Sequence, residues 1–305
     1  MALGKRLLSF GGSGGGANVH FLLVAGGGSG GGLSQKSGGG GAGGLRTSYA
    51  ASGGGGSAET PLVFNTGVTY TVTVGAGGAN TNSPGFKDTL PGGTSSITGA
   101  DITSISCTGG GGGGRNYRGG GYHLSGQSGG SGGGGNSTHS GGSGTANQGF
   151  AGSAGNTAYG GGGGGSAQAG GPQVSGYSTA TGDSGDGNAV NILNATNANT
   201  SSVGDIHGSD VYYAGGGTGA IGYATPGKGG GVAANFQGPQ GAGTPNTGAG
   251  GSSIYNTAAR LGGSGVGILR LPTANYSGTT TGSPDVYTEG TDTVIVFKGT
   301  GTYTH

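Results

Sequence analysis

The sequence is poor in cysteine, tryptophan and charge. Of its 305 residues one is cysteine, Cys107, none is tryptophan, and 7% are charged, against roughly 25% in an average globular domain. A single cysteine excludes an intrachain disulfide. The formal net charge is +1, and no charged residue occurs between Gly119 and Gly182. Since disordered chains are usually kept in solution by charge, this composition argues against simple disorder.

Long apolar runs are also missing. The apolar stretch at 20–25 is far shorter than the roughly 20 residues of a membrane-spanning helix, so we expect no membrane insertion. The N-terminal MALGKRLLSF stops being apolar at Gly11, which is too short for a secretory signal. We therefore expect a protein made and first folded in a cytoplasm without a signal peptide.

Residues 1–16 read as a short basic arm that carries leucines. The arm is either a docking peptide for a larger assembly or a flap packed on its own domain, and the spacing of its apolar residues does not decide between helix and irregular structure. The candidate docking residues are Leu3, Leu7, Leu8 and Phe10.

Motifs for catalysis and nucleic-acid binding are lacking. The five histidines lie far apart and form no HExxH pair, and no nucleophile elbow occurs, so the sequence predicts no enzyme, no cofactor and no catalytic metal. RNYRGGGY at 115–122 resembles segments that bind single-stranded RNA. A net charge of +1 gives little attraction to phosphates, so we expect no nucleic-acid partner. GDSGDGN at 182–188 could offer oxygens to Ca²⁺, or simply form turns.

What the chain has instead is glycine, at 90 positions. Fixing a backbone costs roughly 1–2 kcal/mol per residue, so ordering 90 glycines costs on the order of 100 kcal/mol. Backbone hydrogen bonds must then form at nearly every residue. Collagen is excluded because glycines run six in a row and prolines total 9. The runs instead predict laterally hydrogen-bonded polyglycine-II helices over 108–251.

Strand signals flank this glycine-rich middle. VTYTVTV alternates apolar and threonine side chains, as a half-buried strand does. An all-β fold follows, with little or no α-helix, in which a small sheet or sandwich built from both termini frames a polyglycine-II helix bundle. Residues 17–305 would form one domain. The island at 183–213 reads as an exposed loop or hairpin. Strands are predicted near 19–25, 68–74, 97–107, 266–271 and 293–297.

Tyrosines are scattered through the Gly, Ser, Asn and Thr of the middle. This mixture is typical of antibody paratopes, where Tyr gives large contacts at low entropic cost. The tyrosines either form a recognition surface or cover the flanks of the bundle. The candidate receptor-binding residues are Tyr117, Tyr122, Tyr159, Tyr177, Tyr212, Tyr213, Tyr223 and Tyr255.

An ordered series of glycine blocks carries a family resemblance. FLLVAGGGSGGG (21–32), GGGGAGGL (38–45), YTVTVGAGG (70–78), YAGGG (213–217), GTPNTGAGG (243–251) and GGSGVGILRL (262–271) follow one another along the chain. This order resembles the glycine-rich domain of tailed-phage virion proteins, found in tail fibres and appendages. The predicted bundle is similar to that of the polyglycine-II distal tail-fibre adhesins of T-even-like phages.

The resemblance implies a structural protein of a phage virion, present in multiple copies. Its expected role is an exposed tail-fibre or tip component that binds a host surface glycan or outer-membrane protein. The alternative is a capsid or tail decoration protein that binds other virion proteins. A third class, an ice-binding or matrix protein, would show a regular threonine ladder on a flat face, of which VTYTVTV supplies one short row.

Overall fold

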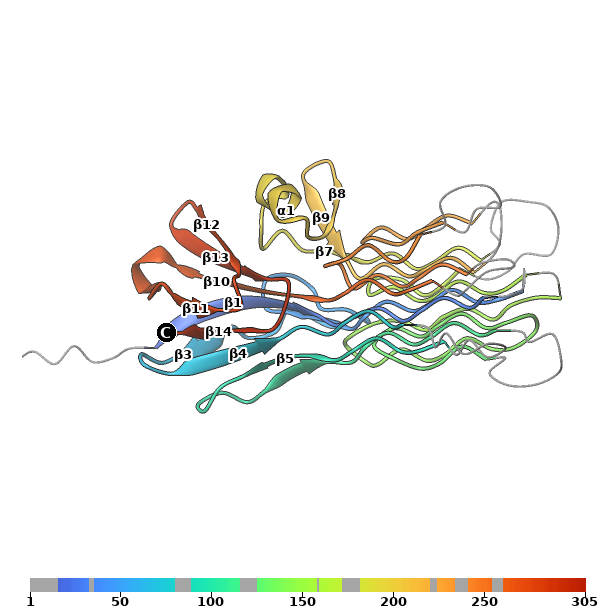
Figure 1. The fold of residues 1–305 in the computed structure, drawn as a ribbon, viewed down its shortest axis with the longest axis horizontal. Helices are drawn as coiled ribbons and strands as arrows, with labels where there is room; N and C mark the ends of the chain where they lie inside the picture. The colour runs from blue at the N-terminus through green and yellow to red at the C-terminus, as the bar shows by residue number, and fades with distance from the viewer. Residues whose placement is uncertain are drawn as a thin grey trace, which may run out of the picture.

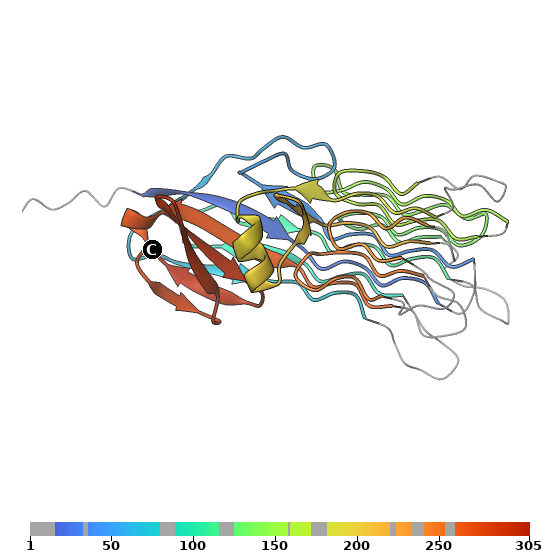
Figure 2. The same ribbon diagram turned by 90° about the horizontal axis from the view of Figure 1, so that it is seen from above.

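The computed structural model describes residues 16–32, 36–79, 89–115, 125–157, 159–171, 182–219, 224–233, 241–253 and 260–305. Strands gather at one end of the molecule, and glycine-rich segments run side by side away from them (Figures 1 and 2). The strands are antiparallel and, over the described residues, form three sheets. The predicted all-β class is confirmed, and the described part of the chain contains one short α-helix.

The six-stranded sheet is the middle layer. Its order is β12-β13-β10-β1-β2, and β3 also pairs with β1. Because β1 is buried on both faces, its sequence is a nearly continuous apolar run rather than an alternating one. The strands are β1 (Ala17–Val24), β2 (Leu45–Thr47), β3 (Leu62–Phe64), β10 (Val266–Pro272), β12 (Asp285–Glu289) and β13 (Asp292–Phe297).

The five-stranded sheet covers one face of the middle sheet. Its order is β11-β14-β4-β5-β6. Phe21 and Leu23 of β1 face this sheet and meet Tyr70 and Val72 of β4 in one apolar core. The strands are β11 (Thr279–Thr281), β14 (Gly301–Thr304), β4 (Thr69–Thr73), β5 (Ser95–Thr98) and β6 (Ile105–Cys107). A 3-10 turn, η1 (Thr273–Asn275), follows β10.

The outer surface of the five-stranded sheet carries only hydroxyl side chains, and we call it the hydroxyl face. Three rows of residues in register cross the strands. Two of the threonine pairs bond through their hydroxyls at 2.8 Å, Thr69 with Thr304 and Thr281 with Thr302. The rows are Thr279, Thr304 and Thr69; Thr281, Thr302, Thr71 and Thr98; and Thr73, Ser96 and Ser106.

A small cap covers the other face of the middle sheet. It consists of β7 (Asn188–Ala189), α1 (Ala195–Ser201), β8 (Asp205–His207) and β9 (Asp210–Tyr213). The prediction of an exposed loop or hairpin over 183–213 is wrong in part: β8 and β9 do form a hairpin, but the island is a packed layer. Its apolar residues, scattered among Asn and Thr in the sequence, are buried against β1 and β10. These are Val190, Ile192, Leu193, Val203 and Val211.

Charged and polar side chains fasten the cap. Asn194 caps α1 by accepting a hydrogen bond from the N–H of Asn197. Glu289 of β12 in turn accepts from the Asn194 N–H at 3.0 Å and from the Asn197 side chain at 2.9 Å. Arg270 of β10 pairs with Glu289 at 3.0 Å and with Asp292 at 2.9 Å. The cap is therefore tied to the middle sheet by one connected network.

Hydrogen bonds in the glycine bundle repeat every three residues. In segment 38–44, N–H groups three apart donate to one neighbour, so the seven donors reach three segments. Gly38, Gly41 and Gly44 donate to segment 108–114; Gly39 and Ala42 to 160–166; Gly40 and Gly43 to 247–252. This period is that of a threefold helix of the polyproline-II type.

The carbonyls of segment 38–44 accept from a further set of neighbours. Segment 25–31 donates to Gly38, Gly41 and Gly44, while Ser131, Gly134 and Gly217 donate to the rest of the bonded carbonyls. One segment thus lies inside a ring of six others. Glycine is required here, because a Cβ at Gly41 would lie within 3.0 Å of the Ser131 carbonyl, a separation that real Cβ atoms do not show.

The bundle is larger than predicted on both sides and is interrupted in the middle. Segments 25–32, 36–44, 75–79 and 89–93 precede residue 108 and 260–265 follows residue 251, yet all bond into the same bundle. Conversely, 188–213 is the cap. The five predicted strand regions are confirmed, with 97–107 divided into β5 and β6. The bundle forms within one chain.

Candidate functional site

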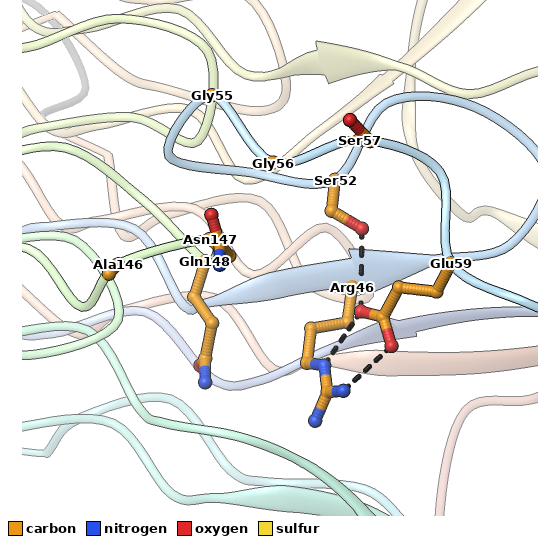
Figure 3. Close-up of a pocket in the computed structure, with 9 residues that line it drawn as sticks. All are labelled: Arg46, Ser52, Gly55, Gly56, Ser57, Glu59, Ala146, Asn147 and Gln148. Atoms are coloured by element: carbon orange, nitrogen blue, oxygen red, sulfur yellow. Dashed lines mark hydrogen bonds and ion pairs between the residues drawn. The ribbon is translucent and has the colours of Figure 1, made fainter.

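A polar pocket lies where the middle sheet meets the glycine bundle (Figure 3). Its volume is about 520 Å³. One wall comes from β2 and the loop after it, and the other from the turn at 145–148. The lining residues are Arg46, Ser52, Gly55, Gly56, Ser57, Glu59, Ala146, Asn147 and Gln148.

An ion pair occupies the first wall. Both Nε and Nη2 of Arg46 donate to the carboxylate of Glu59 at 2.7 Å, a bidentate geometry. Nη1 donates to the Ser106 carbonyl at 3.2 Å. The hydrogen bond that Arg46 donates to Glu59, more than any other cause, raises the pKa of Arg46. Each charge neutralises the other, so the wall is polar without a net charge.

The second wall is held by backbone and side-chain contacts of Gln148. Its carbonyl accepts from the Leu45 N–H at 3.0 Å, and its side-chain oxygen accepts from the Thr108 N–H at 2.7 Å. Asn147 has a positive φ of 57°, which Asn tolerates better than most residues. Among the described residues, the Asn147 carboxamide and the Ser57 hydroxyl have no hydrogen-bond partner.

No motif or spacing in the sequence indicates this pocket. Arg46 and Glu59 are thirteen residues apart in an unremarkable stretch, and Asn147 belongs to a part of the chain a hundred residues away. The signal that the sequence does carry is the scarcity of charge, since the chain has 11 basic and 10 acidic residues among 305.

The structure brings together few of the candidate tyrosines. Tyr117, Tyr122, Tyr177, Tyr223 and Tyr255 lie outside the described residues, as do the arm residues Leu3, Leu7, Leu8 and Phe10. Tyr159 is half-buried and closes a short turn with Asn156, whose side chain accepts from the Tyr159 N–H at 2.8 Å. Tyr212 is half-buried beside His207, with the Lys228 ammonium 5.0 Å from its ring centroid.

Tyr159 and Tyr212 are separated by the length of a bundle segment. Tyr159 directly precedes segment 160–166, and at the other end of that segment Ser166 donates to Ala214, which follows β9. Seven residues of a threefold helix span roughly 20 Å. These two tyrosines therefore do not share a contact surface.

Tyr213 is a correction to the candidate list. Its side chain is fully buried in the core between the cap and the middle sheet. Burial raises the pKa of its hydroxyl, which has no hydrogen-bond partner among the described residues. Strand alternation explains the outcome, because neighbouring residues of β9 point to opposite faces and Tyr212 takes the outer one. A receptor has no access to Tyr213.

The aspartates of GDSGDGN bind backbone N–H groups. Asp183 accepts from Thr225 at 2.5 Å and Asp186 from Lys228 at 2.9 Å, so both carboxylates satisfy the neighbouring segment 224–228. Over the described residues, no group of three or more His, Cys, Asp or Glu side chains could hold a metal ion. No described helix is long and apolar enough to cross a membrane.

Comparison with known proteins adds nothing to this geometry, since no protein family, curated protein or solved structure matches the chain.

Proposed function

We propose that this chain is a structural protein of a phage virion, an exposed tail-fibre or tip component that contacts the host surface with the bundle end. The observation that carries the proposal is the polarity of the molecule. The C-terminus and the start of β1 lie at the end remote from the bundle (Figure 1). Attachment through the chain ends would leave the glycine bundle projecting.

Contacts at one corner support this polarity. Gly16, which precedes β1, lies against Asn65 at the end of β3. The backbone of His305 bonds to Gly67 at 2.6 Å and to Val68 at 3.0 Å, in the same connection between β3 and β4. Gly16 therefore lies at the same corner of the molecule as the C-terminal His305. The resemblance of the glycine blocks to tail-fibre domains adds a second, independent support.

Cell binding tests the proposal. The purified chain is compared with a variant carrying Tyr117, Tyr122, Tyr159 and Tyr223 as alanine. A Tyr49→Ala variant is the matched control, since Tyr49 is an exposed tyrosine of the sheet end. We expect the native chain and the control to bind host cells and the fourfold variant to lose binding. If no form binds cells while the chain attaches to emptied phage particles, the alternative role of a decoration protein stands instead.

A second candidate function follows from the hydroxyl face. The expected ladder of an ice-binding protein is present there as three rows in register, not one. Strands lie about 4.8 Å apart and same-face residues about 6.8 Å apart, so the hydroxyls repeat in two directions. The face has no carboxylate for a mineral and no aromatic ring for a crystalline polysaccharide. With a mineral and a crystalline polysaccharide disfavoured, ice is the repetitive surface that a face of hydroxyl groups fits.

Thermal hysteresis separates this candidate from the first. Thr71→Lys with Thr302→Lys would place two charges in the central row, whereas Thr288→Lys would place one on an exposed position of β12, in another sheet. We expect hysteresis from the native chain and from the Thr288 variant, and none from the double variant. A native chain without hysteresis rules out the ice-binding function.

A further inference from the structure

We infer that the pocket between Arg46, Glu59 and Asn147 binds a neutral saccharide of one or two rings. The pocket lies at the junction of sheet and bundle, so this inference does not depend on which end of the molecule meets a host cell. Its volume of about 520 Å³ falls within the roughly 300–1,000 Å³ typical of small-ligand sites.

Charge balance excludes ionic ligands. The Arg46 guanidinium is bound on two nitrogens by Glu59, so an incoming anion would have to displace a carboxylate already in bidentate contact. A cation would meet the guanidinium beside the same carboxylate. Neither an anion nor a cation can bind without disrupting the Arg46–Glu59 ion pair, whose side chains are about three-quarters buried. The ligand that fits is uncharged.

The lining also excludes ligands with large apolar surfaces. Its carbon surface is limited to Ala146, the α-carbons of Gly55 and Gly56, and the stems of the polar side chains. No aromatic ring lines the pocket, which disfavours a nucleobase. An apolar ligand would strip water from these polar groups without replacing the hydrogen bonds that they made with it.

The unused hydrogen-bonding capacity matches a polyol. Arg46 commits three of its N–H groups, which leaves two of five. The Glu59 oxygens retain free lone pairs, and the Ser57 hydroxyl and Asn147 carboxamide each offer a donor and an acceptor. The lining therefore offers both donors and acceptors. A sugar hydroxyl, which donates and accepts at once, satisfies such a lining at each position.

The two walls give the site a rigid frame. Arg46 projects from β2, whose backbone is paired with β1, and the opposite wall is fixed to β2 by the bond from Leu45 to Gln148. The ion pair holds the Arg46 and Glu59 side chains in place before any ligand arrives. A ligand that binds this site orders mainly Ser57 and Asn147, which limits the entropic cost.

Binding is measured with the full chain by ligand-observed NMR. The probes are neutral disaccharides of glucose, galactose, mannose and N-acetylglucosamine, together with a sialylated disaccharide as the acidic probe. The test variant is Ser57→Ala with Asn147→Gly, which removes both unpartnered polar groups while keeping a residue that tolerates positive φ at 147. The control is Ser283→Gly with Thr288→Ala, which makes matched changes at exposed positions, one of them with positive φ, outside the pocket.

We expect at least one neutral disaccharide to bind with a Kd of roughly millimolar size. The test variant should bind it at least tenfold more weakly and the control variant equally well, with unfolding temperatures unchanged. Glu59→Gln removes the negative charge that pairs with Arg46. It should therefore weaken binding of the neutral sugar and strengthen binding of the sialylated one.

Three results would overturn the inference. The first is that no neutral disaccharide binds at roughly 10 mM, which is ten times that Kd. The second is that the native chain prefers the sialylated probe. The third is that the native chain and the test variant bind the neutral disaccharide equally well. Because the tyrosines of the cell-binding test are untouched here, failure of this inference leaves the proposed function standing, and the reverse holds as well.

Discussion

The sheet end and the glycine bundle are ordered by different means. In the sheet end, each strand bonds to neighbours in one plane and buries side chains above and below it, as β1 does between two cores. In the bundle, segment 38–44 bonds to neighbours in six directions and has almost no side chains to bury. A hydrogen-bonded backbone can therefore replace a side-chain core, provided that no side chains hold its segments apart.

The largest expected effect is in the centre of the bundle. Gly41→Val would place a branched side chain against the Ser131 carbonyl, with no flexible group able to move away. We expect a loss of about 4–5 kcal/mol or more in the free energy of unfolding, an exceptional value for one substitution. Chemical denaturation followed by circular dichroism measures it.

Gly299→Ala is a control at a glycine with open space around it. Nothing lies within 4 Å of the Cβ it would add, and its φ is not positive. Unfolding should be unchanged or about 0.4–1 kcal/mol more costly, because the unfolded chain loses freedom. If the two variants had similar stabilities, close backbone contact would not be what holds the bundle together.

A smaller loss is expected from the core of the sheet end. Leu23→Ala removes a fully buried side chain but leaves every backbone hydrogen bond of β1 in place. Such truncations cost about 2–5 kcal/mol. Calorimetry should show a lower unfolding temperature. An effect larger than that of Gly41→Val would reverse the contrast between the two regions.

The cap should respond locally rather than globally. Glu289→Gln keeps the shape of the side chain but weakens its bonds to Arg270 and to the start of α1. We expect a loss of about 1–3 kcal/mol. Hydrogen exchange should speed up in α1 and β8 and stay unchanged in segment 38–44. Faster exchange throughout the bundle would show that the two regions unfold together.

The smallest effect appears only at alkaline pH. Burial, followed by donation of its hydroxyl to Asp101 at 2.8 Å, raises the pKa of Tyr70 from 10 to about 12. The fold therefore favours the neutral form of Tyr70. The contribution of this group to the free energy of unfolding is complete below pH 10 and is lost as pH rises through 12. In Tyr70→Phe, denaturation midpoints should depend less on pH in that window. If the midpoints of the native chain and the variant depended equally on pH, other groups would cause the loss of stability at alkaline pH.

Local patterns predicted the elements but not their neighbours. The alternation in 68–74 and the apolar run at 19–25 identify β4 and β1, and the six-residue glycine runs identify a period-three bundle. Which segment lies beside which is not encoded locally, because glycine runs look alike from either end. The cap was missed for a related reason: its apolar residues follow no single period among Asn and Thr.

The candidate site was predictable to a lesser degree. Of two neighbouring candidates, Tyr212 lies half-buried on the outer face of β9, whereas alternation in the strand sends Tyr213 into the core. The pocket depends on a tertiary contact between β2 and the turn at 145–148, and no spacing in the chain reports that contact.

The lateral direction of the bundle's hydrogen bonds has a mechanical consequence. Force applied along the bundle axis loads these bonds in shear, and many of them share it at once. Force that peels an outer segment away loads them one after another, each worth about 1 kcal/mol. The bundle therefore resists tension along its length, whereas a sideways pull on one outer segment breaks its hydrogen bonds in sequence.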